Sequence, residues 1–327
     1  MQPMVRDGQA GSAGRAALLA LMLLAPALVA GCQGSGIDST PVPPQRPAAR
    51  PAADQPLAPE SLAMKDRLAK LQAQLLSQGL LRQDTGATDA PFDARILAEN
   101  FERIALYDEY TARGGAFVQG AVPSRLRRWE SPVTMAVEFG ATIPAAQRAK
   151  DRAEITGYAR RLSRISGLPI RMAPVEAANY TVLVLNEGDR IGFADRLDAL
   201  FPNIDAASRS SILTMGPSTY CLVFAYSTGS SPVYTRAVAV IRGEHPDLMR
   251  LSCIHEELAQ GLGLANDSPT ARPSIFNDDE EFALLTPMDE LMLRMLYDPR
   301  LRPGMTPDEA RPVVQQMATE ILPPPPS

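Results

Sequence analysis

Apolar residues recur every three or four positions in five stretches of the chain, and this period places them on one face of an amphipathic helix. In residues 61–82, Met64, Leu68 and Leu75 follow this period until Gly79 interrupts it. Glycines at 114–115 and at 167 end two later patterns in the same way. The spacing therefore predicts helices over residues 61–82, 93–113, 145–166, 247–264 and 287–296.

Short runs rich in Val, Ile, Tyr and Phe lie between these helices and are typical of strands. They predict strands over residues 133–139, 170–172, 180–185, 220–226 and 236–241. A polar, partly helical insert fills residues 188–218. From Trp129 onward the predicted order is strand, helix, four strands, helix, loop and helix, which predicts an α+β domain over residues 126–312.

The first 31 residues have the pattern of an export signal. Arg6 and Arg15 give it a positively charged start, and the apolar run that follows, residues 16–29, is short for a membrane span. The run ends in the letters L-V-A-G-C, which resemble a bacterial lipobox closing at Cys32. This resemblance predicts cleavage before Cys32 and attachment of lipid, palmitate included, to the mature chain. The alternative is an ordinary secretory signal with a chance cysteine.

A lipid on Cys32 predicts a protein tethered to the bilayer by acyl chains and facing the periplasm. Gln33, rather than Asp, follows the cysteine, which favours the outer membrane over the inner one. Residues 32–60 are rich in Pro and Ala and are predicted to be a semi-extended linker. Residues 61–113 form the predicted N-terminal helical segment, and residues 313–327 a tail.

Two interpretations of the first helix, residues 61–82, stay open. It packs on its own domain, or it forms a short coiled coil or weak dimer contact through its apolar positions. Only about three heptads fit before Gly79. We therefore expect packing on its own domain or a weak dimer contact rather than a long coiled coil.

Charge and histidine content narrow the classes of function. The 327 residues carry a net charge of -5, and no Lys/Arg stripe stands out, which argues against nucleic acid as the main partner. The chain has only two histidines, His245 and His255. A zinc site ordinarily uses two or three His or Cys ligands, so this composition weighs against zinc.

Residues 253–267 combine a helical pattern with a glycine turn and a polar face. Their sequence is C-I-H-E-E-L-A-Q-G-L-G-L-A-N-D. Aligned on Gly263, it resembles the H-E-x-x-H-x-x-G-x-x-H helix of metzincin zinc peptidases. Glu256, Gln260 and Asn266 then stand in the three ligand positions. The resemblance implies a zincin-like twisted sheet over an active-site-type helix without a zinc site.

The residues in these positions define the candidate chemistry. Glu257 stands where metzincins hold a general base, but a base needs a polarised water to act on. Glu256, Gln260 and Asn266 offer oxygen atoms, which suit Ca²⁺, Mg²⁺ or Mn²⁺ rather than zinc. We therefore expect no cofactor and a hydrogen-bonded polar cluster. The alternative is a weakly bound divalent cation on these three residues, beside Asp267.

A second register of the same motif begins one residue earlier, with His255 as the first ligand. It fails because Ala259 occupies the second ligand position. His255 also lies about 100° around the helix from Glu256, toward the apolar side. A packed or hydrogen-bonded histidine is therefore expected.

Two further resemblances extend beyond this stretch. Thr286, Asp289 and the pair Leu296-Tyr297 are similar to the helix that follows the Met-turn in matrixins, although Phe276 stands where the Met belongs. The chain as a whole resembles an uncharacterised family of bacterial lipoproteins, domain of unknown function 2927. That resemblance is carried by Trp129, Cys221, Cys253, Glu256-Glu257 with Gln260, Leu262-Gly263-Leu264, Asn266-Asp267, Ser274 to Asp278, Leu296 to Pro299 and Pro303 to Met305.

Cys221 and Cys253 remain once Cys32 is assigned to the lipid. Two cysteines in an exported domain predict a disulfide, which would join a sheet strand to the head of the motif helix. Two buried free thiols are the alternative, because pairing requires Cα atoms within about 7 Å.

These observations support three hypotheses of function. The expected one is a membrane-anchored envelope lipoprotein whose degenerate zincin-like domain binds an envelope protein, a peptide or a cell-wall ligand without cutting it. The alternative is an atypical metallopeptidase that uses Glu256, Gln260 and Asn266 with Glu257 as general base. A third is an assembly factor that acts through residues 61–113.

Overall fold

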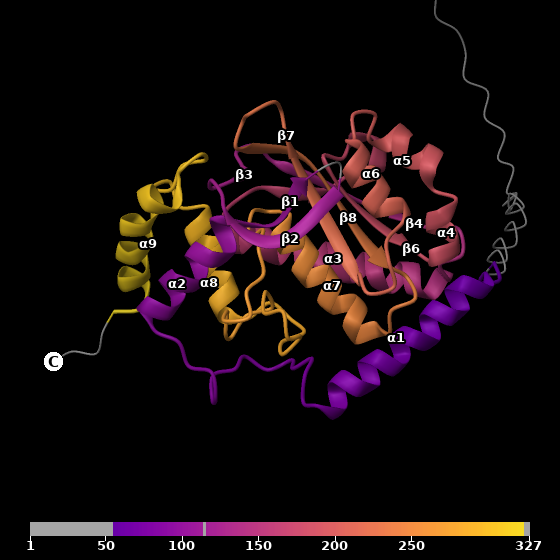
Figure 1. The fold of residues 1–327 in the computed structure, drawn as a ribbon, viewed down its shortest axis with the longest axis horizontal. Coiled ribbons are helices and arrows are strands. Elements are labelled where there is room, and N and C mark those ends of the chain that lie inside the picture. Colours follow the sequence, from indigo (N-terminus) through magenta and orange to yellow (C-terminus); the bar gives the residue numbers. More distant parts are fainter. Residues whose placement is uncertain (1–54, 114–115, 324–327) are drawn as a thin grey trace, which may run out of the picture. The chain divides into compact units, whose positions relative to one another are not determined.

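The computed structural model describes residues 55–113 and 116–323, all within one compact unit, residues 52–327. The predicted signal, Cys32 and most of the 32–60 linker lie outside the described residues. Within the described part, no helix has the length and apolar character needed to pass through a bilayer. Nine α-helices and a mainly parallel sheet give these residues a mixed α/β fold (Figure 1).

The elements of the described chain have the following bounds. The strands are β1 (Tyr107–Arg113), β2 (Ala116–Pro123), β3 (Arg128–Trp129), β4 (Val133–Phe139), β5 (Ile170–Met172), β6 (Tyr180–Leu185), β7 (Cys221–Ser227) and β8 (Val233–Arg242). The helices are α1 (Pro59–Ser77), α2 (Ala94–Ala105), α3 (Ala145–Ser166), α4 (Glu187–Ile191), α5 (Ala194–Leu200), α6 (Ala206–Leu213), α7 (Asp247–Gln260), α8 (Pro287–Leu296) and α9 (Pro307–Ile321), with a 3₁₀ turn at Val175–Ala177.

A six-stranded sheet forms the centre of the fold. Its hydrogen-bonded order is β3-β8-β6-β4-β5, and β7 pairs with β8. All paired strands are parallel except β7, which runs antiparallel to β8. Every residue of β6 is buried, as the almost continuous apolar sequence of a central parallel strand requires.

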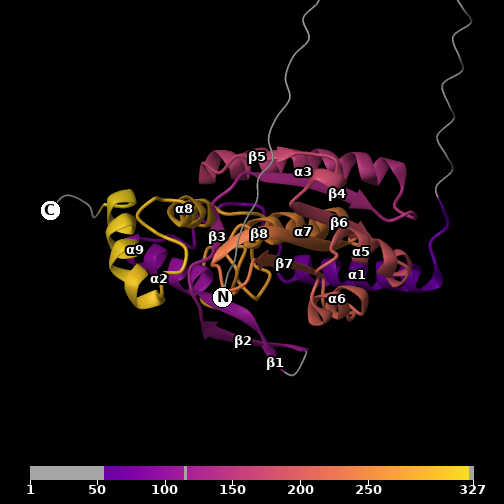
Figure 2. The same ribbon diagram turned by 90° about the horizontal axis from the view of Figure 1, so that it is seen from above.

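Helices cover both faces of this sheet (Figure 2). α3, α7 and α8 share the main core with residues such as Val182 and Ala239. α5 and α6 share a second core with Leu183 and Val238, the neighbouring positions on the same strands. Because side chains alternate along a strand, β6 and β8 contribute to both cores.

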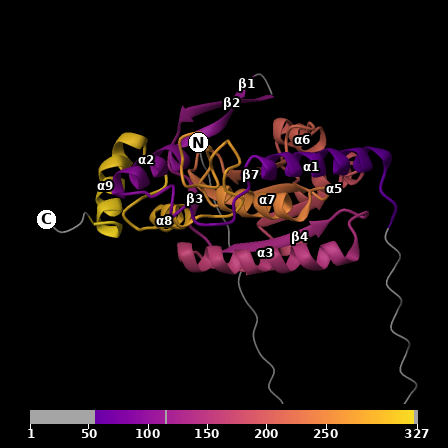
Figure 3. The same cartoon turned by 90° about the horizontal axis from the view of Figure 1, so that it is seen from below.

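α1 packs on its own domain, beside α4 and the first turn of α7 (Figure 3). Leu68 is fully buried. The Gly188 amide donates to Ser61 Oγ (2.9 Å), and the Met249 amide donates to Gln72 Oε1 (3.1 Å). The first interpretation of this helix is confirmed. Beyond α1, Arg82 pairs with Glu281, so the segment after the helix is also tied to the domain.

The predicted helix over residues 93–113 is wrong beyond Ala105. α2 ends there, and β1 pairs antiparallel with β2 from Tyr107↔Pro123 to Arg113↔Ala116. Aromatic and β-branched residues favour strands once a partner strand is present. The helical period of the apolar residues in this stretch carried no information about that partner.

The C-terminal tail was predicted to begin at residue 313, but residues 307–321 form α9. Thr306 and Glu309 make a reciprocal capping box at its start. This T-x-x-E signature was present in the sequence and predicts a helix start. α9 packs against α2, so the N- and C-terminal parts of the domain contact each other.

The bounds of several predicted elements agree with the structure to the residue, notably β4, α3, β5, β6 and α8. The expected mixture of helices and strands is confirmed. Because the sheet is mainly parallel with helices between its strands, the architecture is interleaved α/β rather than segregated α+β.

Candidate functional site

Four aromatic side chains hold the C-terminal end of α7 against the sheet and its neighbours. A carbonyl oxygen has two lone pairs, so carbonyls of the helix and of the turn after it can accept hydrogen bonds from side chains outside the helix. The bonds run from Tyr158 Oη to His255 O (2.8 Å), Tyr180 Oη to Glu257 O (2.7 Å), Trp129 Nε1 to Gly261 O (2.9 Å) and Tyr297 Oη to Leu262 O (2.8 Å). The helix end and the turn after it are therefore held by side chains of α3, β3, β6 and the residue that follows α8.

Two glycines make this close approach possible. A Cβ at Gly261 would lie 2.1 Å from Tyr180 Oη. Gly263 has φ +123°, and a Cβ there would lie 2.3 Å from the Arg127 carbonyl oxygen. Only glycine adopts this conformation without strain, so the G-L-G turn follows from backbone packing.

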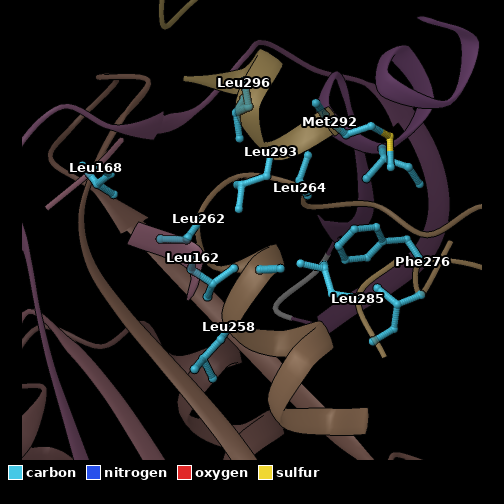
Figure 4. Packing of buried hydrophobic residues seen from close by; sticks show 14 of the residues in the cluster. Leu162, Leu168, Leu258, Leu262, Leu264, Phe276, Leu285, Met292, Leu293 and Leu296 are labelled. Atoms are coloured by element: carbon cyan, nitrogen blue, oxygen red, sulfur yellow. The ribbon is translucent and has the colours of Figure 1, made fainter. Parts of the chain in front are cut away.

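Leucines fill the space beneath the turn. Figure 4 shows Leu258 and Leu262 near Leu162 of α3, with Leu293 and Leu296 of α8 on the other side. All five side chains are fully buried. The apolar face predicted for the motif helix is therefore the face that joins the core.

The structure brings Gln260 and Asp267 together at the end of α7. Gln260 Nε2 donates to Asp267 Oδ1 (2.8 Å), and Gln260 is 8% exposed. Glu256, one turn earlier on the helix, is half-buried. A metal ligand at this position would have to present a lone pair to the metal. The amide nitrogen of Gln260 instead donates a hydrogen bond to the Asp267 carboxylate.

Asn266 is bound to the end of α2 rather than to Gln260. Its Nδ2 donates to the Arg103 carbonyl oxygen (2.8 Å), and its backbone amide donates to the Ile104 carbonyl oxygen (3.1 Å). Asn266 is 2% exposed, and its Oδ1 has no hydrogen-bond partner in the part of the chain that the structure describes. α2 therefore lies against the third ligand-like position.

Glu257 is buried, at 4% exposure, beside the hydrogen-bonded helix end. Its carboxylate contributes to raising the pKa of Tyr180, whose main cause is burial. Glu257 therefore lies on the side of α7 that faces the sheet, close enough to affect Tyr180 of β6.

His255 lies on a different face from the ligand-like residues. Its ring stacks on Tyr158 with centroids 4.0 Å apart, and its Nδ1 accepts the Leu285 amide (3.2 Å). Burial, followed by the nearby Arg161 charge, lowers the pKa of His255 to about 3. The expectation of a packed, hydrogen-bonded histidine is confirmed.

His245, the other histidine, is buried and contacts a backbone carbonyl group. Its Nε2 lies 2.9 Å from the Tyr220 carbonyl oxygen, and burial lowers its pKa to about 4. In the described residues no three His, Cys, Asp or Glu side chains gather as metal ligands. The donors at the α7 end, an amide that donates to a carboxylate and a second amide bound to α2, do not fit zinc.

The predicted disulfide is confirmed between Cys221 of β7 and Cys253 of α7. Their Cα atoms are 5.9 Å apart, within the range that a disulfide spans. The bond joins the antiparallel edge strand to the middle of the motif helix.

The loop before α8 is organised by a fully buried carboxylate, Asp289. Its oxygens accept hydrogen bonds from the Ser274 hydroxyl (2.5 Å), the Ile275 amide (3.0 Å) and the Thr286 amide (2.8 Å). Thr286 caps α8 as predicted. The pairing of Asp289 with Ser274 and Ile275 was not predicted, because it joins residues from separate segments.

Sequence reasoning also missed a buried ion pair at the start of α7. Arg250 Nε donates to Asp151 Oδ1 of α3 (2.7 Å), and both side chains are at most 5% exposed. Asp151 occupies the inward face of an otherwise apolar helical pattern, and this was the signal available. A cavity of about 200 Å³ opens here, between α3 and the first half of α7, away from Gln260.

Comparisons with known proteins identify one family. Residues 94–316 match the model of a family described as "Protein of unknown function (DUF2927)". No curated protein and no solved structure matches the chain.

Proposed function

The chain belongs to this family of proteins of unknown function, DUF2927, and from its own residues we propose that it is a lipid-anchored envelope protein whose zincin-like domain binds without cutting. The ligand we propose is a peptide, a cell-wall fragment or an envelope protein. The bilayer is contacted through acylated Cys32, in the outer membrane and facing the periplasm.

The observation that carries this proposal is the use of the ligand-like side chains. Gln260 donates to Asp267, and Asn266 donates to the end of α2, so both amides already take part in internal contacts. Both histidines of the chain are buried elsewhere. A helix end held by hydrogen bonds, with polar side chains on it, supports recognition more than hydrolysis, because within the described ranges no three His, Cys, Asp or Glu side chains come together to hold a Lewis-acid metal.

The relationship to metzincins is part of the proposal. It is supported by the order from β4 onward: strand, helix, strands, motif helix, loop and capped helix. It is also supported by the glycine turn at Gly263 and by the Thr286 cap of α8. We infer that the domain retains the frame of a zincin around a site that no longer holds zinc.

Metal content and hydrolysis test the proposal together. We expect less than about 0.1 equivalent of divalent metal by mass spectrometry in residues 52–327 purified without chelator, because two amides and one carboxylate bind cations weakly. We also expect no cleavage of a mixed peptide library. Glu257→Gln is the matched variant, since it keeps the shape of the side chain. Cleavage that disappears in Glu257→Gln would refute the non-cutting proposal.

The alternative function is an atypical metallopeptidase, and one observation favours it. Asn266 Oδ1 is a buried acceptor with no hydrogen-bond partner among the described residues. A cation on Glu256, Gln260 and Asn266, with Glu257 as general base, would use this oxygen. Near-stoichiometric metal that is lost in both Glu256→Ala and Gln260→Ala would establish this alternative.

A further inference from the structure

α3 lies on the opposite side of the domain from the β1–β2 hairpin (Figures 2 and 3), and three of its arginines are exposed. The helix contains six basic residues and two acidic ones, and Asp151, one of the acidic pair, is buried. We define the basic face as Arg152, Arg160 and Arg164 of α3 together with Arg294 of α8, all of which are exposed.

Arg294 belongs to this surface because an ion pair joins α8 to α3 one helical turn before Arg294. Arg161 Nε donates to Glu290 Oε1 (2.8 Å). Arg294 lies four residues after Glu290, and residues at this spacing share a face of a helix. Arg294 therefore lies on the side of α8 that faces Arg161, a residue of the C-terminal half of α3, to which Arg164 also belongs.

The arginines of the basic face are available for contacts outside the chain. None of the four forms a hydrogen bond or ion pair with another residue in the described ranges, although Arg152 lies 5.1 Å from the Phe139 ring centroid. The neighbouring basic residues differ, since Lys150 pairs with Asp247 and Arg161 with Glu290.

Acidic side chains do not neutralise the face. Glu154 and Glu290 are half-buried, and Glu290 is already paired with Arg161. The exposed residues between the arginines include Ala149 and Ala153, which are small and uncharged. A concentrated positive surface on a chain of net charge -5 indicates attraction to one anionic partner.

We propose that the basic face docks on an anionic phospholipid surface. Arg152 and Arg164 are twelve residues apart, about 18 Å along the helix axis, which is too long for one small anion and suits an extended layer of phosphates. Arginine pairs with phosphate through a planar fork of donors. Docking through α3 would turn the β1–β2 hairpin away from the bilayer. This inference does not depend on what the α7 end binds.

Vesicle sedimentation of residues 52–327 tests the proposal without a lipid anchor. We expect binding to vesicles of phosphatidylglycerol and phosphatidylcholine, little binding to phosphatidylcholine alone, and weakening as salt screens the charges. In R160Q/R164Q/R294Q, affinity should fall about a hundredfold, because each basic residue near an anionic leaflet contributes about 1 kcal/mol, or roughly fivefold.

The matched control is R67Q/R171Q/R302Q, which removes three exposed arginines outside the basic face. We expect less than about a fivefold loss in this variant, because its charges lie outside the docking surface. Replacement of Arg160, Arg164 and Arg294 by lysine should preserve binding, since a bilayer responds to charge. Far-UV circular dichroism checks that every variant is folded.

Three results would overturn the proposal. They are equal losses in the two glutamine variants, no binding of the parent to anionic vesicles, and stronger binding to a nucleic acid than to vesicles. Loss of binding in the lysine variant, or competition by inorganic phosphate, would show instead a specific phosphate site. Because the fragment lacks Cys32, none of these results bears on the lipid anchor or on the α7 site.

Discussion

At the scale of single residues, the end of α7 is shaped by side chains that bind backbone carbonyls. Tyr158, Tyr180, Tyr297 and Trp129 each bury an aromatic ring and place one polar atom on the helix end. Buried Tyr and Trp ordinarily find such a partner. These aromatic hydrogen bonds, and not the side chains of Glu256, Gln260 and Asn266, fix the position of the helix end.

Gly263→Ala is expected to destabilise the domain by about 3 kcal/mol or more, from backbone strain together with overpacking. The added Cβ would lie 2.3 Å from the Arg127 carbonyl oxygen, at a φ of +123°. Gly157→Ala in α3 is the control, since a Cβ there meets nothing within 4 Å. We expect the control to gain about 0.5–1 kcal/mol from helix propensity. Urea denaturation measures both, and equal effects would contradict the packing argument.

The two buried histidines make stability depend on pH. Their pKa values are about 4 for His245 and about 3 for His255, below the unfolded value of about 6.5. Above pH 6.5 neither state is protonated. As pH falls below 6.5, only the unfolded state gains protons, so each histidine removes about 1.4 kcal/mol of stability per pH unit.

The test compares His245→Gln/His255→Gln with the parent at pH 7.5 and pH 5. We expect the stability difference between the two proteins to change by about 4 kcal/mol in favour of the variant at pH 5. The comparison is needed because the raised pKa values of Glu280, about 7, and Asp289, about 6, act in the opposite direction. A difference that does not change with pH would show that the histidines titrate normally in the folded state.

At the scale of elements, α7 is tied along its whole length. Arg250 pairs with Asp151 of α3 near its start, Cys253 joins β7 in its middle, and the aromatic donors hold its end. The anchoring elements come from both sides of the motif in the sequence. A helix held in this way keeps its polar face in one position, as a binding site requires.

Cys221→Ala/Cys253→Ala is expected to lower the free energy of unfolding by about 3–4 kcal/mol, the chain-entropy value for a 32-residue separation. Fluorescence of Trp129, the single tryptophan, reports the urea transition. The parent protein treated with a thiol reductant is the control and should match the variant. A loss below about 1 kcal/mol would show that packing alone fixes β7 on α7.

α2 and α9 illustrate how elements distant in sequence define the site. α2 supplies the carbonyl groups that bind Asn266, and α9 packs against α2. The period of residues 93–113 predicted one long helix, whereas the structure divides it into a helix and a strand. The division depends on β2, a partner that local periodicity does not report.

At the scale of the whole molecule, the predicted lipid on Cys32 and the proposed contact of the basic face would together define how the protein meets a membrane. Expression with the native signal should yield a mature chain that begins at acylated Cys32 and fractionates with membranes. In high salt, which screens the contact of the basic face, Cys32→Ser should leave the membrane fraction, whereas Cys221→Ala should remain in it. Mass spectrometry of the first peptide measures this, and a mature terminus at another residue would exclude the lipoprotein proposal.

The sequence by itself determined the central strands, the helices other than α2 and α9 that the apolar period predicted, and the polar face of the motif helix, and it identified Cys221 and Cys253 as the candidate disulfide pair. These features follow from local periods and from residue chemistry, which neighbouring positions carry. The tertiary structure alone decided the β1–β2 hairpin, the contact of Asn266 with α2 and the gathering of Arg164 and Arg294 on one face. The contact of Asn266 with α2 and the placing of Arg294 near α3 depend on residues far apart in the chain, whose approach is set by packing of the whole core. The hairpin joins adjacent segments, but its strand pairing is a contact that the helical period of residues 93–113 does not report.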